Sequence, residues 1–267
     1  SDFGLMGAAP THPDLLDWLA HWFTHEGEWS LKKLHRLILS SNTYRMSNRW
    51  NDEYGRGDPE NKLRWRFPSR RLEVEAIRDS ILAVSGQLNP KMRGPRMYRF
   101  IAKEAMDGHS DPNSVGKSSD EVEASRRTVY AFVKRSLVVP MLEVLDLCDS
   151  TQSADKRSIT SIAPQALTLY NGDFVNGQAA HFATRLVKEA GADPVKQIER
   201  AYLLAVCRAP TASETANLRT FMEREAKNLV GASIPTGKPL SPEAATRGAL
   251  IQMCRVIFNL NEFVYTD

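Results

Sequence analysis

Amphipathic segments of helical spacing recur along the chain, and most of them begin at a recognisable helix cap. In the C-terminal half the caps are Asp173, Asp193-Pro194, the capping box Thr211–Glu214 and Ser241-Pro242. A capping side chain satisfies free amides of the first turn, and apolar residues three and four positions apart then form one buried stripe. The sequence therefore predicts a mainly α fold, an irregular multi-helix bundle with at most a small two-stranded β element.

Two more helices are predicted near the N-terminus. Thr11 supplies a capping hydroxyl and Pro13 a first-turn proline for one helix, and Ser30 caps the other. We expect the two to form a helical hairpin with apolar stripes facing inward. The residues predicted to point inward are Leu15, Leu19, Trp22, Leu31, Leu34, Leu37 and Ile38.

A central helix is predicted over residues 68–86. Its apolar stripe has a 3-4-3-4 spacing and consists of Val74, Ile77, Ile81, Val84 and Leu88. On another face, two cations and two carboxylates share about 100° of helical arc; they are Arg71, Glu75, Arg78 and Asp79. Two interpretations stay open: an exposed ladder of ion pairs, or a partly buried polar network beside a cleft.

The strongest signal for anion binding lies just before that helix. Residues 62–71 hold five cations in ten positions, beside Trp65 and Phe67. Arginines next to aromatic rings suit phosphate or carboxylate ligands, but neighbouring carboxylates could neutralise them within the protein, which we favour. A nucleic-acid role is not expected, because no other basic stripe supports it. The candidate ligand or partner-binding residues are Arg64, Arg66, Arg70, Arg71, Glu73, Glu75, Arg78 and Asp79.

The middle of the chain predicts little regular structure. Residues 89–124 are rich in Gly, Pro, Ser and Asp and predict a long loop, with 107–123 expected to be mobile. Within it, 111–118 superficially resembles a phosphate-binding loop, but Asp111 replaces the first glycine and no buried strand precedes it. Residues 126–133 have strand-like composition and could pair with 63–67.

Length and composition suit one globular domain. The 267 residues are 42% hydrophobic and 25% charged, with a net charge of +3. We predict a single helical domain with an N-terminal helical part (1–90), a loop and short-strand region (91–160) and a C-terminal helical part (161–267). No apolar run reaches the roughly 20 residues that cross a bilayer. Because the chain starts at Ser1 and not at Met, we expect it to be a piece of a longer protein.

No cofactor is expected in this chain. Cys148, Cys207 and Cys254 are odd in number and widely spaced, which excludes a fully paired disulfide framework and a haem-attachment motif. His21 and His25 lie four residues apart, a spacing that can hold a metal, with Asp17 as a third candidate. The surrounding metalloprotease pattern is absent, so we expect no metal.

Six strings together resemble one protein family. They are Thr11–Leu19, Trp29–Ile38, Thr43–Arg45, Arg70–Asp79, Pro164–Leu167 and Asn261–Phe263. The chain resembles the planctomycete-specific C-terminal domain of unknown function, number fifteen fifty-three, of planctomycete cytochrome c type proteins. It departs from the usual family pattern at Thr160-Ser161 and at Tyr170.

The resemblance implies a setting more than a mechanism. Such proteins are exported and carry a haem-bearing segment and a further domain upstream. The resemblance therefore implies a periplasmic or extracellular location. It also implies the upstream domains as partners, and anionic polysaccharide as a further candidate partner. We favour a non-catalytic binding or scaffolding module. The alternative is part of an extracytoplasmic enzyme acting on polysaccharides, with its carboxylate pair drawn from Glu73, Glu75 and Asp79, although nearby arginines disfavour an acid catalyst there.

Overall fold

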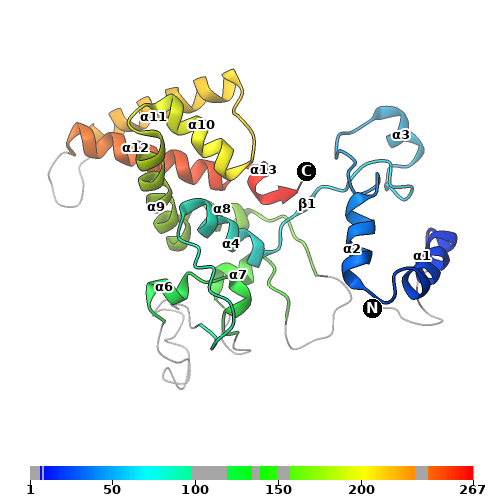
Figure 1. Cartoon of the computed structure of the whole chain (residues 1–267). Coiled ribbons are helices and arrows are strands. Elements are labelled where there is room, and N and C mark those ends of the chain that lie inside the picture. Colours follow the sequence, from blue (N-terminus) through cyan, green and yellow to red (C-terminus); the bar gives the residue numbers. More distant parts are fainter. Residues whose placement is uncertain are drawn as a thin grey trace. The chain divides into compact units, whose positions relative to one another are not determined.

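The chain is mainly helical, as predicted (Figure 1). The computed structural model describes residue 7 and residues 9–97, 119–133, 139–149, 157–231 and 240–266. Its β structure in these ranges is small: β1 (Arg70–Arg71) pairs with β2 (Tyr265–Thr266), and two isolated bridges join Asn89 to Arg126 and Met97 to Ala131. None of the described helices is both long and apolar enough to span a membrane.

Internal contacts divide the chain into two compact units. The described residues of the first, which we call the N-terminal unit, fall within Ser1–Arg70 and Tyr265–Asp267. Those of the second, the larger unit, fall within Arg71–Ser153 and Arg157–Val264. Each unit is described by itself below.

The larger unit is a helical bundle around α12 (Pro242–Phe258), which packs against α9 (Asp173–Ala190) and α11 (Ala212–Gly231). The central helix α4 (Val74–Ser85) contacts α9 and α10 (Pro194–Ala205). Shorter helices complete the unit: α6 (Glu121–Ala124), a 3-10 turn at Thr128–Tyr130, α7 (Pro140–Val144), α8 (Ala163–Asn171) and α13 (Asn261–Val264).

The predicted apolar stripes form the core of this unit. Ile77 and Ile81 of α4 are fully buried, and Phe182 of α9 stacks on Phe258 of α12 with ring centroids 5.4 Å apart. Burying a large apolar side chain stabilises the fold by roughly 1.5–3 kcal/mol, so these stripes hold the bundle together. Cys254 is also buried here, whereas Cys148 is half-buried and Cys207 is exposed.

Most predicted caps are present. The amide of Glu214 bonds to Thr211 Oγ1 at 3.2 Å and its carboxylate accepts from the Thr211 amide at 2.7 Å, which is the predicted capping box. Asp193 and Ser241 cap α10 and α12. Asp173, predicted as a cap, is instead the first residue of α9; the N-cap is Gly172, which has no side chain to make a capping bond.

Arg126 organises the segment next to the bundle. Its side chain is completely buried, and its Nε, Nη1 and Nη2 atoms donate to the carbonyl oxygens of Lys91 (3.3 Å), Pro95 (3.0 Å) and Arg93 (2.5 Å), respectively. The guanidinium also lies over the Tyr130 ring, 4.1 Å from its centroid. One side chain thus fixes residues 91–95 against residues 126–130.

The N-terminal unit holds α1 (Pro13–His25), α2 (Leu31–Ser40) and α3 (Asp52–Gly57). Ser30 caps α2 as predicted, accepting a hydrogen bond from the Lys33 amide. Thr11 does not cap α1; the N-cap is His12, whose side chain makes no capping bond, and Thr11 Oγ1 lies 2.9 Å from the His12 ring instead.

Burial in the N-terminal unit differs from the prediction. Among its described residues no apolar side chain is buried. Leu15 and Leu31, both predicted to point inward, are 57% and 62% exposed, and Ile38 is exposed as well. The spacing of these stripes predicted the helices correctly but not what covers them.

The two predicted strands are wrong. Residues 63–67 form turns, because Asn61 and Arg64 adopt positive φ angles of 54° and 58°, which a strand does not tolerate. Residues 128–130 form the 3-10 turn. Most of the predicted loop, including the resemblance to a phosphate-binding loop at 111–118, lies outside the described residues; of the segment expected to be mobile, residues 119–123 are described, and α6 begins at Glu121.

Candidate functional site

The predicted site residues fall into both units. Arg64, Arg66 and Arg70 belong to the N-terminal unit, whereas Arg71 begins the larger unit and Glu73, Glu75, Arg78 and Asp79 follow it. The run of cations in the sequence is therefore divided between the two units. We describe the polar clusters of the larger unit first, and then a groove in the N-terminal unit.

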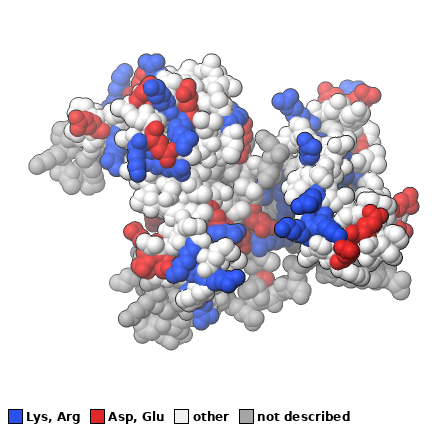
Figure 2. Space-filling model, in the orientation of Figure 1, with Lys and Arg blue, Asp and Glu red and all other residues white. Residues whose placement is uncertain are grey.

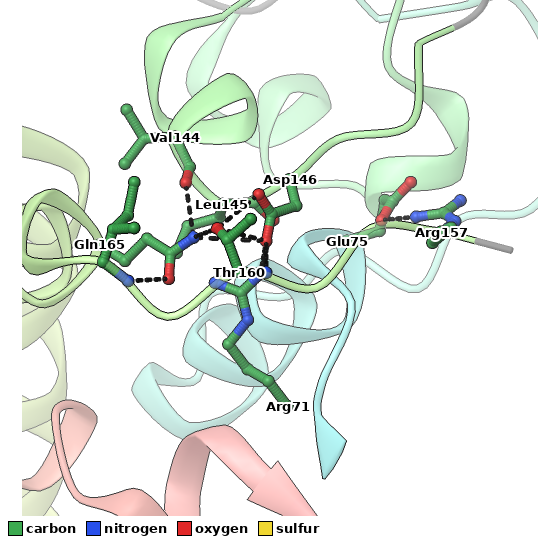
Figure 3. A network of polar contacts seen from close by, with 9 residues as sticks. Arg71, Glu75, Val144, Leu145, Asp146, Arg157, Thr160 and Gln165 are labelled. Atoms are coloured by element: carbon green, nitrogen blue, oxygen red, sulfur yellow. Dashed lines mark hydrogen bonds and ion pairs between the residues drawn. The ribbon is translucent and has the colours of Figure 1, made fainter. Parts of the chain in front are cut away.

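Asp146 is the centre of the polar cluster that contains Arg71 (Figure 3). Its carboxylate pairs with Arg71 Nη2 at 2.5 Å. It also accepts hydrogen bonds from the backbone amide and the hydroxyl of Thr160, at 2.7 and 2.9 Å, and from the side-chain amide of Gln165 at 3.3 Å. Arg71 is 4% exposed and Asp146 14%. The Gln165 side chain also donates to the Val144 carbonyl at 3.0 Å, which joins α7 to α8.

The carboxyl group of Asp146 is held ionised. Burial alone would raise its pKa, but the hydrogen bonds from Thr160 and the charge of Arg71 outweigh burial and hold the pKa below its ordinary value. A carboxyl group of this kind cannot donate a proton near neutral pH. The cluster therefore suits an anchor between α7, α8 and the start of α4, not an acid catalyst.

Arg78 and Asp79 bind the segment that follows α6. Arg78, whose side chain is 3% exposed, donates to the carbonyls of Ala124 at 2.6 Å and Arg126 at 3.1 Å. Both Arg78 Nη1 and Asp79 bond to the Thr128 hydroxyl, at 3.1 and 2.6 Å. The open question of an exposed ladder or a buried network is thus answered for Arg71 and Arg78, because both are buried.

Glu75 and Glu73 share one partner, Arg157. Arg157 Nη1 lies 2.8 Å from Glu75 and 3.6 Å from Glu73, and the bond to Glu75 is the main cause of a raised Arg157 pKa. A catalytic pair would have to be drawn from Glu73, Glu75 and Asp79, and all three already have partners. Glu73 and Glu75 form ion pairs with Arg157, and Asp79 accepts a hydrogen bond from Thr128. This arrangement speaks against a general acid drawn from them.

A groove of about 760 Å³ lies within the N-terminal unit. It is formed by the start of α1, the end of α2 with the turn after it, and the segment 63–68. Two of the predicted site residues, Arg64 and Arg66, line it, and among the described residues no carboxylate does. The other lining residues are Pro10, Thr11, His12, Leu15, Leu16, Leu19, Ile38, Ser41, Thr43, Tyr44, Leu63, Phe67 and Pro68.

Two polar side chains shape the wall that carries these arginines. The Asp58 carboxylate accepts hydrogen bonds from the amides of Lys62 and Leu63, at 2.9 and 2.7 Å. The Asn61 side chain bonds to both the carbonyl and the amide of Arg66, at 2.8 and 3.2 Å. Asp and Asn commonly fix turns in this way, so the alternating sequence becomes a tight turn that directs Arg64 and Arg66 toward the groove.

Arg66 is held by aromatic rings. Its guanidinium carbon lies 5.0 Å from the Trp50 ring centroid and 5.2 Å from that of Trp65, distances typical of cation-π contact. Trp50 packs so closely on Gly55 that a Cβ atom on residue 55 would lie 2.2 Å from Cζ2 of the Trp50 ring. Arg66 Nε is buried and has no hydrogen-bond partner among the described residues. The arginine is therefore positioned by packing, with donor capacity left over.

The charges of the larger unit are mixed. On the face visible in Figure 2, Lys and Arg lie beside Asp and Glu over the described helices of this unit, and no broad surface of one sign is seen there. Mixed charges are typical of internal pairing and not of a basic stripe that binds nucleic acid.

The histidine pair considered as a metal site lies on α1 of the N-terminal unit. The rings of His21 and His25 stack with their centroids 4.1 Å apart, and the described part of the chain holds no group of three residues suited to a metal.

Sequence reasoning missed Asp146, Thr160 and Gln165. Arg71 and Asp146 are 75 positions apart, so no local spacing connects them. The one available signal was the resemblance itself, since Gln165 lies inside one of the strings that carry it and Thr160 was noted as a departure.

The fold and these clusters define a mainly helical domain with a structural polar centre and a separate groove. The family described as PSD1, a protein of unknown function (DUF1553), matches residues 1–222, and the chain belongs to that family. This range covers all of the predicted site residues. No curated protein and no solved structure matches the chain.

Proposed function

We propose that the chain is a non-catalytic binding module, part of an exported, cytochrome-associated multidomain protein, and that it binds through the groove of its N-terminal unit. The observation that carries this proposal is the apolar surface of that unit. Leu15, Leu16 and Leu63 are each more than half exposed around the groove. Large exposed apolar patches commonly mark interaction sites.

The chemistry of the carboxylates supports binding over catalysis. Glycoside hydrolysis needs a carboxyl group with a raised pKa beside a second carboxylate. Asp146 has a lowered pKa, and Glu73, Glu75 and Asp79 are bound to Arg157 and Thr128. None of the described residues that line the groove is a carboxylate. No observation favours the polysaccharide-cleaving alternative.

The partner and the location follow from the family resemblance. It favours the haem-bearing segment and the other upstream domain of the same polypeptide as partners, in the periplasm or outside the cell. The groove suits docking of another polypeptide segment because exposed apolar side chains line it.

Isothermal titration of the purified chain with the haem-bearing segment tests the proposal. We expect saturable binding that Leu16→Asp weakens at least tenfold, since a charge in the groove must be desolvated on binding. Leu203→Asp is the matched control, because Leu203 is similarly exposed, at 49%, but lies on α10. Absence of binding to the upstream segments, or hydrolysis of a polysaccharide lost in Glu75→Gln, would contradict the proposal.

A further inference from the structure

The groove of the N-terminal unit combines apolar walls with positive charge at one side. Leu15 and Leu16 of α1, Ile38 of α2 and Leu63 line it and are all exposed. Arg64 and Arg66 come from the segment 63–68 that also carries Leu63, and no Asp or Glu among the described residues lines the groove to neutralise them. An occupant that complements this surface needs an apolar face with carboxylates beside it.

We propose that the groove binds a helical segment of a protein partner whose apolar stripe is flanked by Asp or Glu. This inference rests on the proposed binding function and adds the chemistry of the partner. In helix-in-groove recognition, apolar anchors at i, i+3 or i+4, and i+7 enter the groove and charged neighbours meet the rim. The carboxylates of the segment would meet Arg64 and Arg66.

The extent of the exposed apolar surface favours a protein segment. Exposed side chains continue on the same two helices outside the groove lining, at Trp18 of α1 (51% exposed) and Leu39 of α2 (50%). A free small amphipathic anion would fill the groove alone. A helix laid along it extends over neighbouring surface as well, and removes more apolar area from water.

The arginines are prepared for a carboxylate. Arg66 is fixed against Trp50 and Trp65, so little side-chain freedom is lost when it pairs. Arg64 is exposed and sits at a positive φ of 58°, which the turn bonded by Asp58 and Asn61 maintains. Charge and geometry on this wall therefore select an acidic partner.

Two synthetic helical peptides provide the test on the full chain. Both carry Leu at i, i+3, i+4 and i+7; one has Glu at the flanking positions and the other has Lys. Fluorescence anisotropy measures the binding of each labelled peptide. We expect the acidic peptide to bind at least tenfold more tightly than the basic one, and Arg64→Glu to remove or reverse this preference.

Control variants separate a charge effect from damage to the fold. Arg224→Glu changes an exposed arginine of α11 in the larger unit and should leave the preference unchanged. Arg66→Gln keeps a long side chain, and we expect it to reduce the preference while circular dichroism stays unchanged. If Arg64→Glu lowers helicity, the change in peptide preference caused by Arg66→Gln is the result that tests the inference.

Three results would overturn the inference. Equal binding of both peptides, lost in Leu16→Asp, would show an apolar dock without charge selection and leave the proposed binding function standing. Binding of dodecanoate with no binding of either peptide would assign the groove to small amphipathic anions. Binding of neither probe would exclude a helical occupant, and titration with the upstream segments would then judge the proposed function by itself.

Discussion

The two units use the same kind of helix in different ways. In the larger unit the apolar stripes of α4, α9 and α12 are buried, whereas in the N-terminal unit the apolar side chains of α1 and α2 are half-buried or exposed and none is buried. Both sets have apolar residues at helical spacing. Periodicity thus reports that a helix has an apolar face; it does not report whether the rest of the same unit covers that face.

Core truncation should show the largest contrast between the units. Phe182→Ala removes a fully buried ring stacked on Phe258, and we expect a loss of about 3–5 kcal/mol in the free energy of unfolding. Leu16→Ala, at a side chain 54% exposed, should cost under about 1 kcal/mol. Urea unfolding measures both. Comparable losses would mean that α1 has a buried face after all.

The buried charge of α4 should come next. Arg78→Ala removes the donor to the Ala124 and Arg126 carbonyls and leaves them unpaired in a buried site, so we expect a loss of roughly 3 kcal/mol. Arg127 also pairs with Asp79, at 3.5 Å, but is 58% exposed, and Arg127→Ala should cost under about 1 kcal/mol. Similar values for the two variants would show that burial does not decide the effect.

The smallest effect concerns acid sensitivity of the larger unit. The hydrogen bonds from Arg208, with that from the Thr211 amide, lower the pKa of Glu214 to about 2 from an ordinary 4.5. Because the folded-state pKa is the lower one, this stabilisation is complete above about pH 4.5 and is lost as pH falls toward about 2.

We expect this carboxyl group to contribute about 1 kcal/mol, since water screens a partly exposed pair. Thermal unfolding of the wild type and Glu214→Gln between pH 6 and pH 2.5 measures it, and the variant should lose less stability in acid. Glu223→Gln, at an exposed pair with Arg219 on α11, is the control and should follow the wild type. A Glu214→Gln curve parallel to the wild type would contradict the shift.

Local chemistry predicted the helices well. Ser30, Asp193, Thr211 and Ser241 each cap the helix that they were expected to cap, because capping involves residues only two or three positions apart. The same locality explains the failure at 63–67. Its alternation is typical of a strand, but a turn is imposed by the hydrogen bond that the Asp58 carboxylate accepts from the Lys62 amide and by the one that the Asn61 side chain donates to the Arg66 carbonyl.

The candidate site was only partly predictable. Charge alone identified Arg64 and Arg66, which line the groove, and Arg71 and Arg78, which are buried. Their partners could not be predicted, because Asp146 and Thr128 reach them from 75 and 50 positions away. Nor could the sequence show that the cation run is divided between two units after Arg70.

The hydrogen bonds of Arg126 limit which residues relatives in the family can have at position 126. Three different nitrogens of its planar guanidinium serve the carbonyls of Lys91, Arg93 and Pro95 from within a fully buried position. A lysine carries the same charge at a single point and cannot reach three diverging acceptors. We therefore expect that only arginine fits position 126 as long as residues 91–95 keep this conformation. Relatives with another residue at position 126 should also differ in residues 91–95.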